Sequence, residues 1–123
     1  MIMKRILVID DEPNLLMMMA ETLQMLGFET LAANGGIDGI ELAAGQKPDL
    51  ILCDLNMPAV DGFETLRRLR GAEATAHIPF VLLSGSADHG TRRQAEDLGA
   101  SAMMTKPFSI SDLLATLNLQ LKA

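Results

Sequence analysis

Short apolar runs alternate along this chain with longer segments in which apolar residues recur every three or four positions. The compact runs are Ile6 to Ile9, Leu50 to Cys53 and Phe80 to Leu83, with a more mixed run over Phe28 to Ala33 and a weaker one at Met103-Met104. Near-continuous apolar runs of this length are typical of strands that are buried on both faces of a parallel sheet. Their alternation with helical segments predicts one α/β domain.

Five segments with helical spacing follow these strands in turn. They cover Pro13 to about Leu26, Gly36 to about Ala44, a segment that opens at Asp61, His89 to about Leu98, and a last one from Ser109. Pro13 fits the first turn of a helix, because the N–H that proline lacks has no intrahelical partner there. Asp61 with Glu64, and Ser109 with Asp112, have the spacing of capping pairs. The fourth helix has the weakest apolar pattern of the five.

The apolar spacing also predicts which face of each helix is buried. On the first helix we expect Leu15, Met18, Met19, Thr22, Leu23 and Leu26 to face the core, which leaves Leu16, Met17 and Ala20 outside. On the third and fifth helices we expect the core residues to be Phe63, Leu66 and Leu69, and Ile110, Leu113, Leu114, Leu117 and Leu121.

The composition narrows the class of protein. The chain has 123 residues, which fits a single domain over residues 1–123. Sixteen acidic against ten basic residues give a net charge of −6, which argues against direct binding to nucleic acid. The single cysteine, Cys53, excludes an internal disulfide. There is no apolar stretch of membrane-spanning length and no cleavable leader, so we expect a cytoplasmic protein without membrane insertion.

Polar residues of particular kinds stand at the ends of the apolar runs. Asp10-Asp11 follow the first run, Asp54 the third, Ser84 the fourth, and Lys106 stands two residues beyond Met104. Because ligands bind outside the carboxyl ends of the strands in an open parallel sheet, we expect these side chains to meet at one edge. Three carboxylates, a hydroxyl and an ammonium group there indicate a site for a divalent cation and a phosphoryl group.

Each residue of this set has a defined chemical capacity and also an ordinary structural explanation. Clustered carboxylates raise one another's pKa unless a cation compensates, and Mg²⁺ prefers oxygen ligands. Asp54 can attack phosphorus in line to give an acyl phosphate, while Ser84 can donate a hydrogen bond to a phosphoryl oxygen. Taken singly, they could be a helix cap, a loop-capping acid, a turn serine and a surface Lys-Pro turn. The hypothesis rests on finding all of these residues together, each at or just beyond the end of a predicted strand. Pro107 also allows a cis bond after Lys106.

At these positions the sequence resembles the receiver domain of two-component response regulators, over the whole chain. The motifs are Asp10-Asp11-Glu12-Pro13, Asp54 followed by Met57-Pro58 and Asp61-Gly62, Ser84, and Gly99-Ala100 leading to Lys106-Pro107-Phe108. The resemblance implies a flavodoxin-like (βα)5 fold, which is a doubly wound parallel sheet with strand order 2-1-3-4-5.

The resemblance also implies a role for each site residue. Asp54 would accept a phosphoryl group from a phosphohistidine on a sensor histidine kinase or a histidine phosphotransfer protein. Asp10, Asp11, Asp54 and the backbone carbonyl of Asn56 would hold Mg²⁺. Ser84 and Lys106 would bind the phosphoryl group, and Ser84 would reorient when it arrives. The fourth helix, fifth strand and fifth helix would signal to a downstream protein target or form a phosphorylation-dependent homodimer.

Two positions depart from the usual family pattern. Met103 stands where an aromatic switch residue is common, and Gly85 stands where alanine is common. The outward residues Leu16, Met17 and Ala20 are either scattered surface residues or a docking patch for a four-helix phosphotransfer partner.

Other functions compete with a stand-alone, chemotaxis-regulator-like receiver. A Mg²⁺-dependent aspartyl phosphatase would need a proton donor two residues after its nucleophile, and the amide of Asn56 cannot protonate a leaving group. An interaction module that has lost phosphorylation would have no use for the acidic cluster, Ser84 and Lys106. A receiver cut from a larger regulator or hybrid kinase would have the same sequence. We therefore expect a phosphoacceptor domain and not an enzyme.

Overall fold

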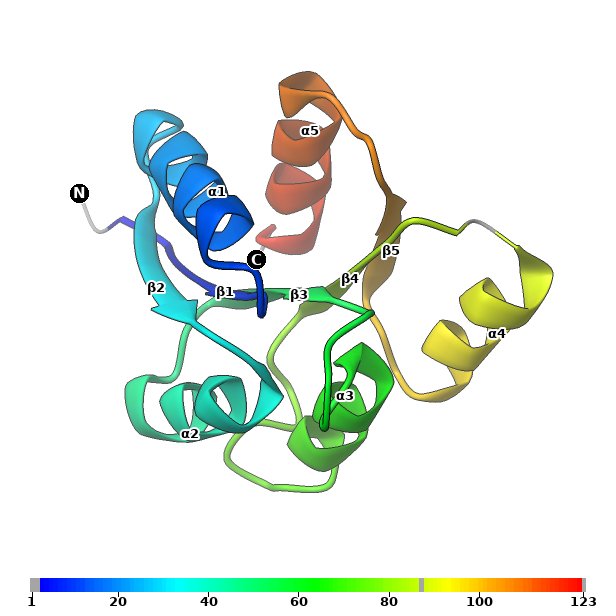
Figure 1. The fold of residues 1–123 in the computed structure, drawn as a ribbon. Helices are drawn as coiled ribbons and strands as arrows, with labels where there is room; N and C mark the ends of the chain where they lie inside the picture. Colours follow the sequence, from blue (N-terminus) through cyan, green and yellow to red (C-terminus); the bar gives the residue numbers. More distant parts are fainter. Residues whose placement is uncertain (1–2, 87, 123) are drawn as a thin grey trace.

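The computed structural model describes residues 3–86 and 88–122, and it contains a five-stranded parallel sheet (Figure 1). The strand order is β2-β1-β3-β4-β5, which confirms the order expected from the resemblance. The strands are β1 (Arg5–Ile9), β2 (Glu29–Ala33), β3 (Leu50–Asp54), β4 (Phe80–Ser84) and β5 (Ala102–Thr105).

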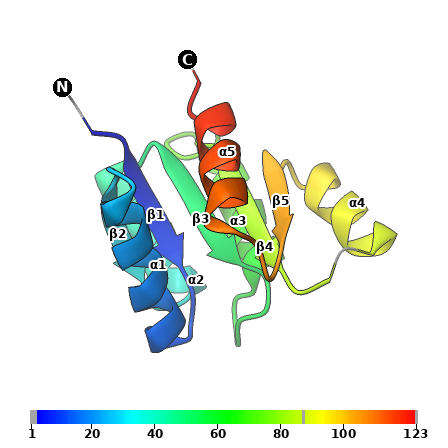
Figure 2. The same cartoon turned by 90° about the horizontal axis from the view of Figure 1, so that it is seen from above.

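Helices cover both faces of this sheet. They are α1 (Pro13–Met25), α2 (Gly36–Gln46), α3 (Gly62–Arg70), α4 (His89–Asp97) and α5 (Ile110–Gln120). Figures 1 and 2 show α1 and α5 side by side on one face, α2 and α3 on the other, and α4 beyond the β5 edge. None of these helices combines the length and the apolar character needed to cross a membrane, within the residues that the structure describes.

The central strands place alternate side chains in two separate cores. Ile6 and Val8 of β1 point into the core under α1 and α5, whereas Leu7 and Ile9 point into the core under α2 and α3. Side chains of a strand alternate between faces, so a strand covered on both sides needs apolar residues at every position. This requirement explains the continuous apolar runs in the sequence.

The buried face of α1 differs from the expected one. Leu16, Met19, Leu23 and Leu26 pack against the core, whereas Leu15 is 47% and Met18 is 62% exposed. The segment from Leu15 to Ala20 is apolar at every position, so its pattern fits more than one helix face. Packing against the sheet decides between these faces. Leu23 is fully buried, and the observed face contains the apolar residues that lie three or four positions from it or from one another, namely Met19, Leu16 and Leu26.

Apolar residues in the first turns of α5 and α2 also lie outside the core. Ile110, expected in the core of α5, is 57% exposed, because it is the first residue of the helix and lies before the first buried turn. The deeper positions Leu113 and Leu117 are buried as expected. Ile37 in the first turn of α2 is likewise 54% exposed.

The helix starts follow the expected capping chemistry with one difference. Asp61 accepts a hydrogen bond from the backbone N–H of Glu64, and Ser109 accepts one from that of Asp112. The Glu64 carboxylate does not complete the capping box at Asp61. It accepts hydrogen bonds from Arg67 and Arg68, which lower its pKa to about 2.

Candidate functional site

The strand ends bring the predicted site residues to one edge of the sheet. Asp54 and Ser84 are the last residues of β3 and β4, and Lys106 directly follows β5. In the strand register Asp54 pairs with Leu83, and Ser84 pairs with Thr105. The site is therefore assembled by backbone pairing between segments about 20 to 50 residues apart in the sequence.

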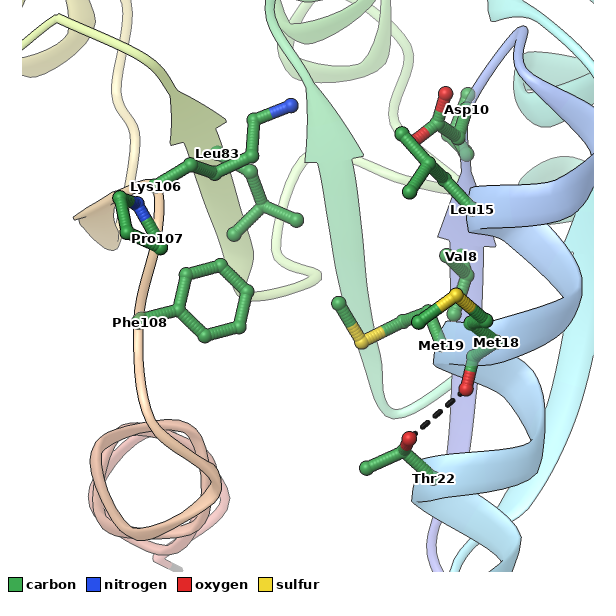
Figure 3. Close-up of a pocket in the computed structure, with 11 residues that line it drawn as sticks. Val8, Asp10, Leu15, Met18, Met19, Thr22, Leu83, Lys106, Pro107 and Phe108 are labelled. Carbon is green, nitrogen blue, oxygen red and sulfur yellow. Dashed lines mark hydrogen bonds between the residues drawn. The ribbon is translucent and has the colours of Figure 1, made fainter.

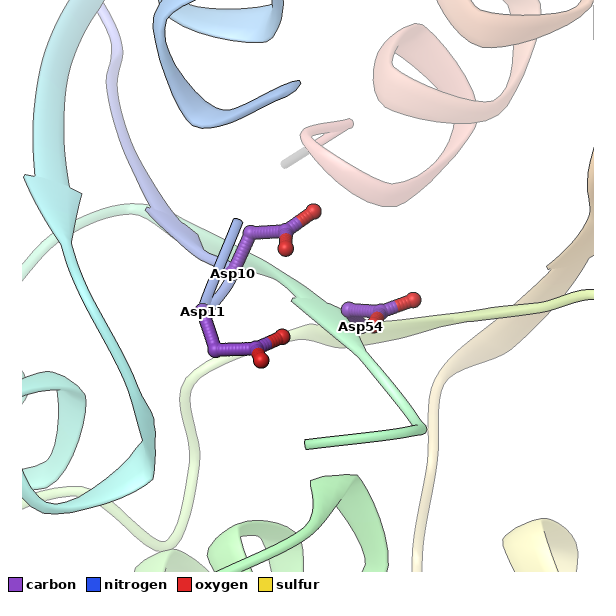
Figure 4. Close-up of side chains that lie close together, drawn as sticks. All are labelled: Asp10, Asp11 and Asp54. Carbon is purple, nitrogen blue, oxygen red and sulfur yellow. The ribbon is translucent and has the colours of Figure 1, made fainter. Parts of the chain in front are cut away.

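Three carboxylates converge at this edge, as Figure 4 shows. Asp10, Asp11 and Asp54 each offer an oxygen atom, and these atoms lie within 4.8 Å of one another. Asp54 is 5% exposed, and the other two are half-buried. The pKa of Asp10 is raised, first by burial and then by repulsion from Asp54 and Asp11, while the Glu12 N–H and Lys106 oppose the rise. All-oxygen ligands with excess negative charge suit a hard divalent cation such as Mg²⁺.

A backbone contact orients one of these carboxylates. Asp10 Oδ1 accepts a hydrogen bond of 2.9 Å from the N–H of Glu12. The Glu12 side chain in turn accepts from the N–H of Leu15 and caps the start of α1. The sequence reasoning assigned no role to Glu12. Glu12 directly precedes Pro13, the first residue of α1, and this position in the sequence could have predicted that it caps the helix.

Lys106 reaches across β4 to the end of β3. Its ammonium group donates a hydrogen bond to Asp54 Oδ1 and forms an ion pair with it. Its backbone N–H donates to the carbonyl of Ser84 at 2.7 Å, which ties the β5 end to the β4 end. The peptide bond between Lys106 and Pro107 is cis, as the sequence allowed.

Ser84 is 1% exposed, and its hydroxyl is engaged by its own loop. Its Oγ accepts a hydrogen bond of 3.1 Å from the N–H of Ser86. The Ser86 hydroxyl donates to Asp88, which also caps α4 through the N–H of Thr91. Because Ser84 Oγ acts as the acceptor toward Ser86, the proton of its hydroxyl stays available for another acceptor. No hydrogen bond joins this hydroxyl to Asp54 or Lys106 in the described part of the chain.

Asn56 and Met103 are the two remaining residues of the predicted site. Asn56 is exposed in the loop between β3 and α3. Met103 is half-buried in β5 and packs against the core under α2 and α3. The metal contact of the Asn56 carbonyl and the switching role of Met103 both stay predictions.

An apolar groove runs from the acidic site along α1, as Figure 3 shows. Its volume is about 500 Å³, and it lies between α1 and the segment that follows β5. One wall comes from α1, the opposite wall is Pro107 and Phe108, and Asp10 and Lys106 stand at the end that meets the site. The α1 wall consists of Leu15, Met18, Met19 and Thr22. These residues were expected in the core, so the sequence reasoning missed the groove.

Comparison with known protein families shows which family shares this sequence. The family described as "Response regulator receiver domain" matches residues 6–118. The DNA-binding dual master transcriptional regulator RpaA of Synechocystis is 42% identical over 92% of this chain and 47% of its own length. Protein PilH of Pseudomonas aeruginosa is 34% identical over 94% of this chain and 96% of its own length. This chain thus spans about half the length of several curated relatives and nearly all of PilH.

Solved structures have the same fold. The chemotaxis protein CheY4 of Vibrio cholerae superimposes with a TM-score of 0.91 at 29% identity, over 96% of this chain and 98% of the other. The receiver domain of the sensor histidine kinase PA1611 of Pseudomonas aeruginosa superimposes with a TM-score of 0.90 at 26% identity, over 99% and 100%. That structure has a magnesium ion coordinated in its active-site cleft.

Proposed function

Because this chain belongs to the response regulator receiver domain family, we propose that Asp54 is the residue that accepts the phosphoryl group. The observation that carries the proposal is the convergence of Asp10, Asp11 and Asp54 at one sheet edge, with Lys106 paired to Asp54. A buried carboxylate that ends a strand beside a fixed cation is placed to act as a nucleophile toward phosphorus. Asn56, two residues on, supplies no acid for turnover of free substrates.

The donor set fits Mg²⁺. We assign Asp10, Asp11, Asp54 and the carbonyl of Asn56 as the groups that hold it, through carboxylate or carbonyl oxygen or through water. When bound, the ion neutralises charge on the oxygens of the transferring phosphoryl group. The raised pKa of Asp10 supports this assignment, because its ionised form lacks sufficient compensation from the protein alone.

The step itself uses groups that are already in place. An Asp54 oxygen forms a bond to phosphorus as the bond from phosphorus to the donor nitrogen breaks, and the electron pair leaves with that nitrogen. The product carries about −1.5 to −2 charges, by analogy with phosphorylated hydroxyls. Lys106 pairs with a phosphoryl oxygen, and Ser84 turns its free proton toward another. Their movement carries the loops after β4 and β5, so phosphorylation shifts a conformational equilibrium.

The donor in this proposal is a phosphohistidine on a sensor kinase or a histidine phosphotransfer protein. Its docking site is the groove along α1, because a helix seated there lies beside Asp10 and Lys106. The patch expected at Leu16, Met17 and Ala20 is corrected in part: Met17 is 61% exposed as expected, but Leu16 packs against the core. Leu15 and Met18, which were expected in the core, are exposed as well. We propose that residues 1–123 form one receiver domain, which signals by contact with a downstream protein through α4, β5 and α5. If the chain belongs to a longer regulator, the same domain would control the output domain attached to it.

The proposal is tested by intact-mass measurement after incubation with acetyl phosphate and Mg²⁺. We expect a mass increase of one phosphoryl group that is lost in Asp54→Ala and on removal of Mg²⁺ with a chelator. Asp97→Ala, at an exposed position of α4, is the matched control and should be labelled like the wild type. Labelling that persists in Asp54→Ala would contradict the proposal. So would continuous hydrolysis of phosphoesters without a phosphorylated protein, which would indicate a phosphatase.

A further inference from the structure

We infer that the groove along α1 accepts the apolar helix faces of several different phosphohistidine-bearing partners, so that this receiver is charged by more than one donor. The inference rests on the proposed function, because it takes the groove as the docking site for the donor. What is new is the breadth of partners: the groove discriminates only weakly between donor proteins. Three features of the groove carry it: the side chains of its α1 wall, the absence of charge on that wall, and its connection to the acidic site.

The adaptable side chains of the groove are methionines. Met18 and Met19 line it; Met18 is 62% exposed, and Met19 is half-buried and also packs against the core under α1 and α5. An unbranched thioether with three rotatable bonds can follow partners of different shape, and surfaces rich in methionine are common in proteins with several partners. Figure 3 shows both side chains extending from α1 toward the space opposite Phe108.

The α1 wall also lacks charged groups. Leu15, Met18, Met19 and Thr22 make this wall, and none of them is ionisable. Proteins reject wrong partners largely with like charges or with charges left unpaired after docking. A wall of this kind gives apolar contact area to many helices and excludes few of them. Glu21, the charged residue of α1, is not part of the groove.

The groove leads directly to the reacting groups. Asp10 and Lys106 stand at one end of it, and Lys106 contacts Asp54. A helix that fills the apolar part therefore brings its own polar end to the acceptor, whichever protein carries it. Lys106 and Asp10 are common to all donors, because they act on the phosphoryl group and not on the partner's sequence. Selection between partners is left to the α1 wall.

The test is a phosphotransfer assay against a panel of purified, phosphorylated histidine kinase and histidine phosphotransfer domains. We expect the wild type to accept phosphate from at least two of them at rates within about tenfold, a difference of roughly 1.4 kcal/mol. In the double variant Met18→Leu/Met19→Leu, volume and helix propensity are nearly kept while side-chain freedom falls. We expect it to stay within about threefold for its best donor and to lose about tenfold or more for the others. Met25→Leu is the matched control, because Met25 is 85% exposed on the same helix and lies outside the groove.

The outcomes separate this inference from the proposed function. A wild type that accepts phosphate from one donor of the panel alone would overturn the inference, and so would a double variant with an unchanged donor profile. In both cases Asp54 would still be labelled by acetyl phosphate. Failure of that small-molecule labelling would overturn the proposed function, and the inference with it. A narrowed profile in the double variant, with Met25→Leu unchanged, would support both.

Discussion

At the scale of single residues, the acidic site is held in an arrangement that the protein stabilises only in part. Asp10 and Asp54 lie close enough to share a cation, and burial and mutual repulsion raise the pKa of Asp10. Lys106 is the cation that contacts Asp54. The fold keeps the carboxylates together because their backbone positions follow from strand pairing and from the Glu12 contact. The fold itself thus brings together three carboxylates that could hold a cation.

The first prediction concerns the charge of Asp10. Its raised pKa means that the ionised form is less stable in the native state than in the unfolded chain, so its contribution to stability falls as the pH rises through that pKa. Asp10→Asn should therefore raise the melting temperature at neutral pH in the presence of a chelator. Adding Mg²⁺ should raise the melting temperature of the wild type and have little effect on the variant.

Thermal unfolding followed by circular dichroism measures both effects. Glu73→Gln removes an exposed carboxylate from the loop after α3 and should leave the melting temperature and its response to Mg²⁺ as in the wild type. A lower melting temperature for Asp10→Asn in the chelator would count against the assigned electrostatic penalty.

At the scale of elements, the site depends on how closely α3 approaches the end of β3. Gly62 is the first residue of α3, and its N–H donates to the carbonyl of Leu55 at 2.8 Å. A Cβ atom at this position would lie 2.7 Å from the carbonyl oxygen of Asp54 and 2.8 Å from Leu55 Cα. Both neighbours are backbone atoms, which cannot move aside as a flexible side chain would. The glycine is therefore required by the contact between helix and strand.

The second prediction compares two glycine substitutions. Gly62→Ala should lower the free energy of unfolding by about 1–3 kcal/mol and slow labelling of Asp54, because the clash displaces the end of β3. Gly45 lies inside α2, and a Cβ added there would have no described atom within 4 Å other than its chain neighbours and its own helix backbone. Gly45→Ala should therefore raise stability by about 0.5–1 kcal/mol. Urea unfolding and acetyl phosphate labelling test the pair, and equal effects of the two substitutions would refute the contact argument.

At the scale of the whole molecule, one sheet is shared by two cores. Leu69 of α3 is fully buried in one core and Leu117 of α5 in the other. β1, β3 and β4 contribute to both, so neither core keeps its shape without the sheet between them. Asp54 and Ser84 end two of the strands that both cores share, so the acidic edge adjoins both cores. The proposed output surface of α4, β5 and α5 is far along the chain from Asp10.

The third prediction is that the two faces unfold together. Leu69→Ala and Leu117→Ala should each cost about 2–5 kcal/mol, since each leaves a cavity in a packed core. Leu119→Ala on the same helix as Leu117 should change stability by less than about 0.5 kcal/mol, because Leu119 is 66% exposed. Urea titration followed by NMR signals from α3 and α5 should give coincident midpoints in each variant. Separate midpoints would show that the faces are independent.

Much of the fold and the site was predictable from local pattern. The apolar runs at Ile6 to Ile9 and Leu50 to Cys53 are long enough to define buried strands, and the polar residues that follow them mark the sheet edge. The face of α1 was not predictable, because Leu15 to Ala20 is apolar throughout and periodicity needs polar positions to define a face. The groove follows from that face, so it was missed for the same reason.

The sequence by itself determined the order of strands and helices and the placement of Asp54, Ser84 and Lys106 at strand ends, because these features depend on residue types at short spacing. Tertiary structure alone decided which apolar residues of α1 pack against the core and which line the groove, with Met19 doing both. It also decided that Lys106 pairs with Asp54 and that Ser84 accepts a hydrogen bond from Ser86. These contacts depend on strand register and on where each helix settles against the sheet, and such long-range packing leaves no periodic signal in the chain.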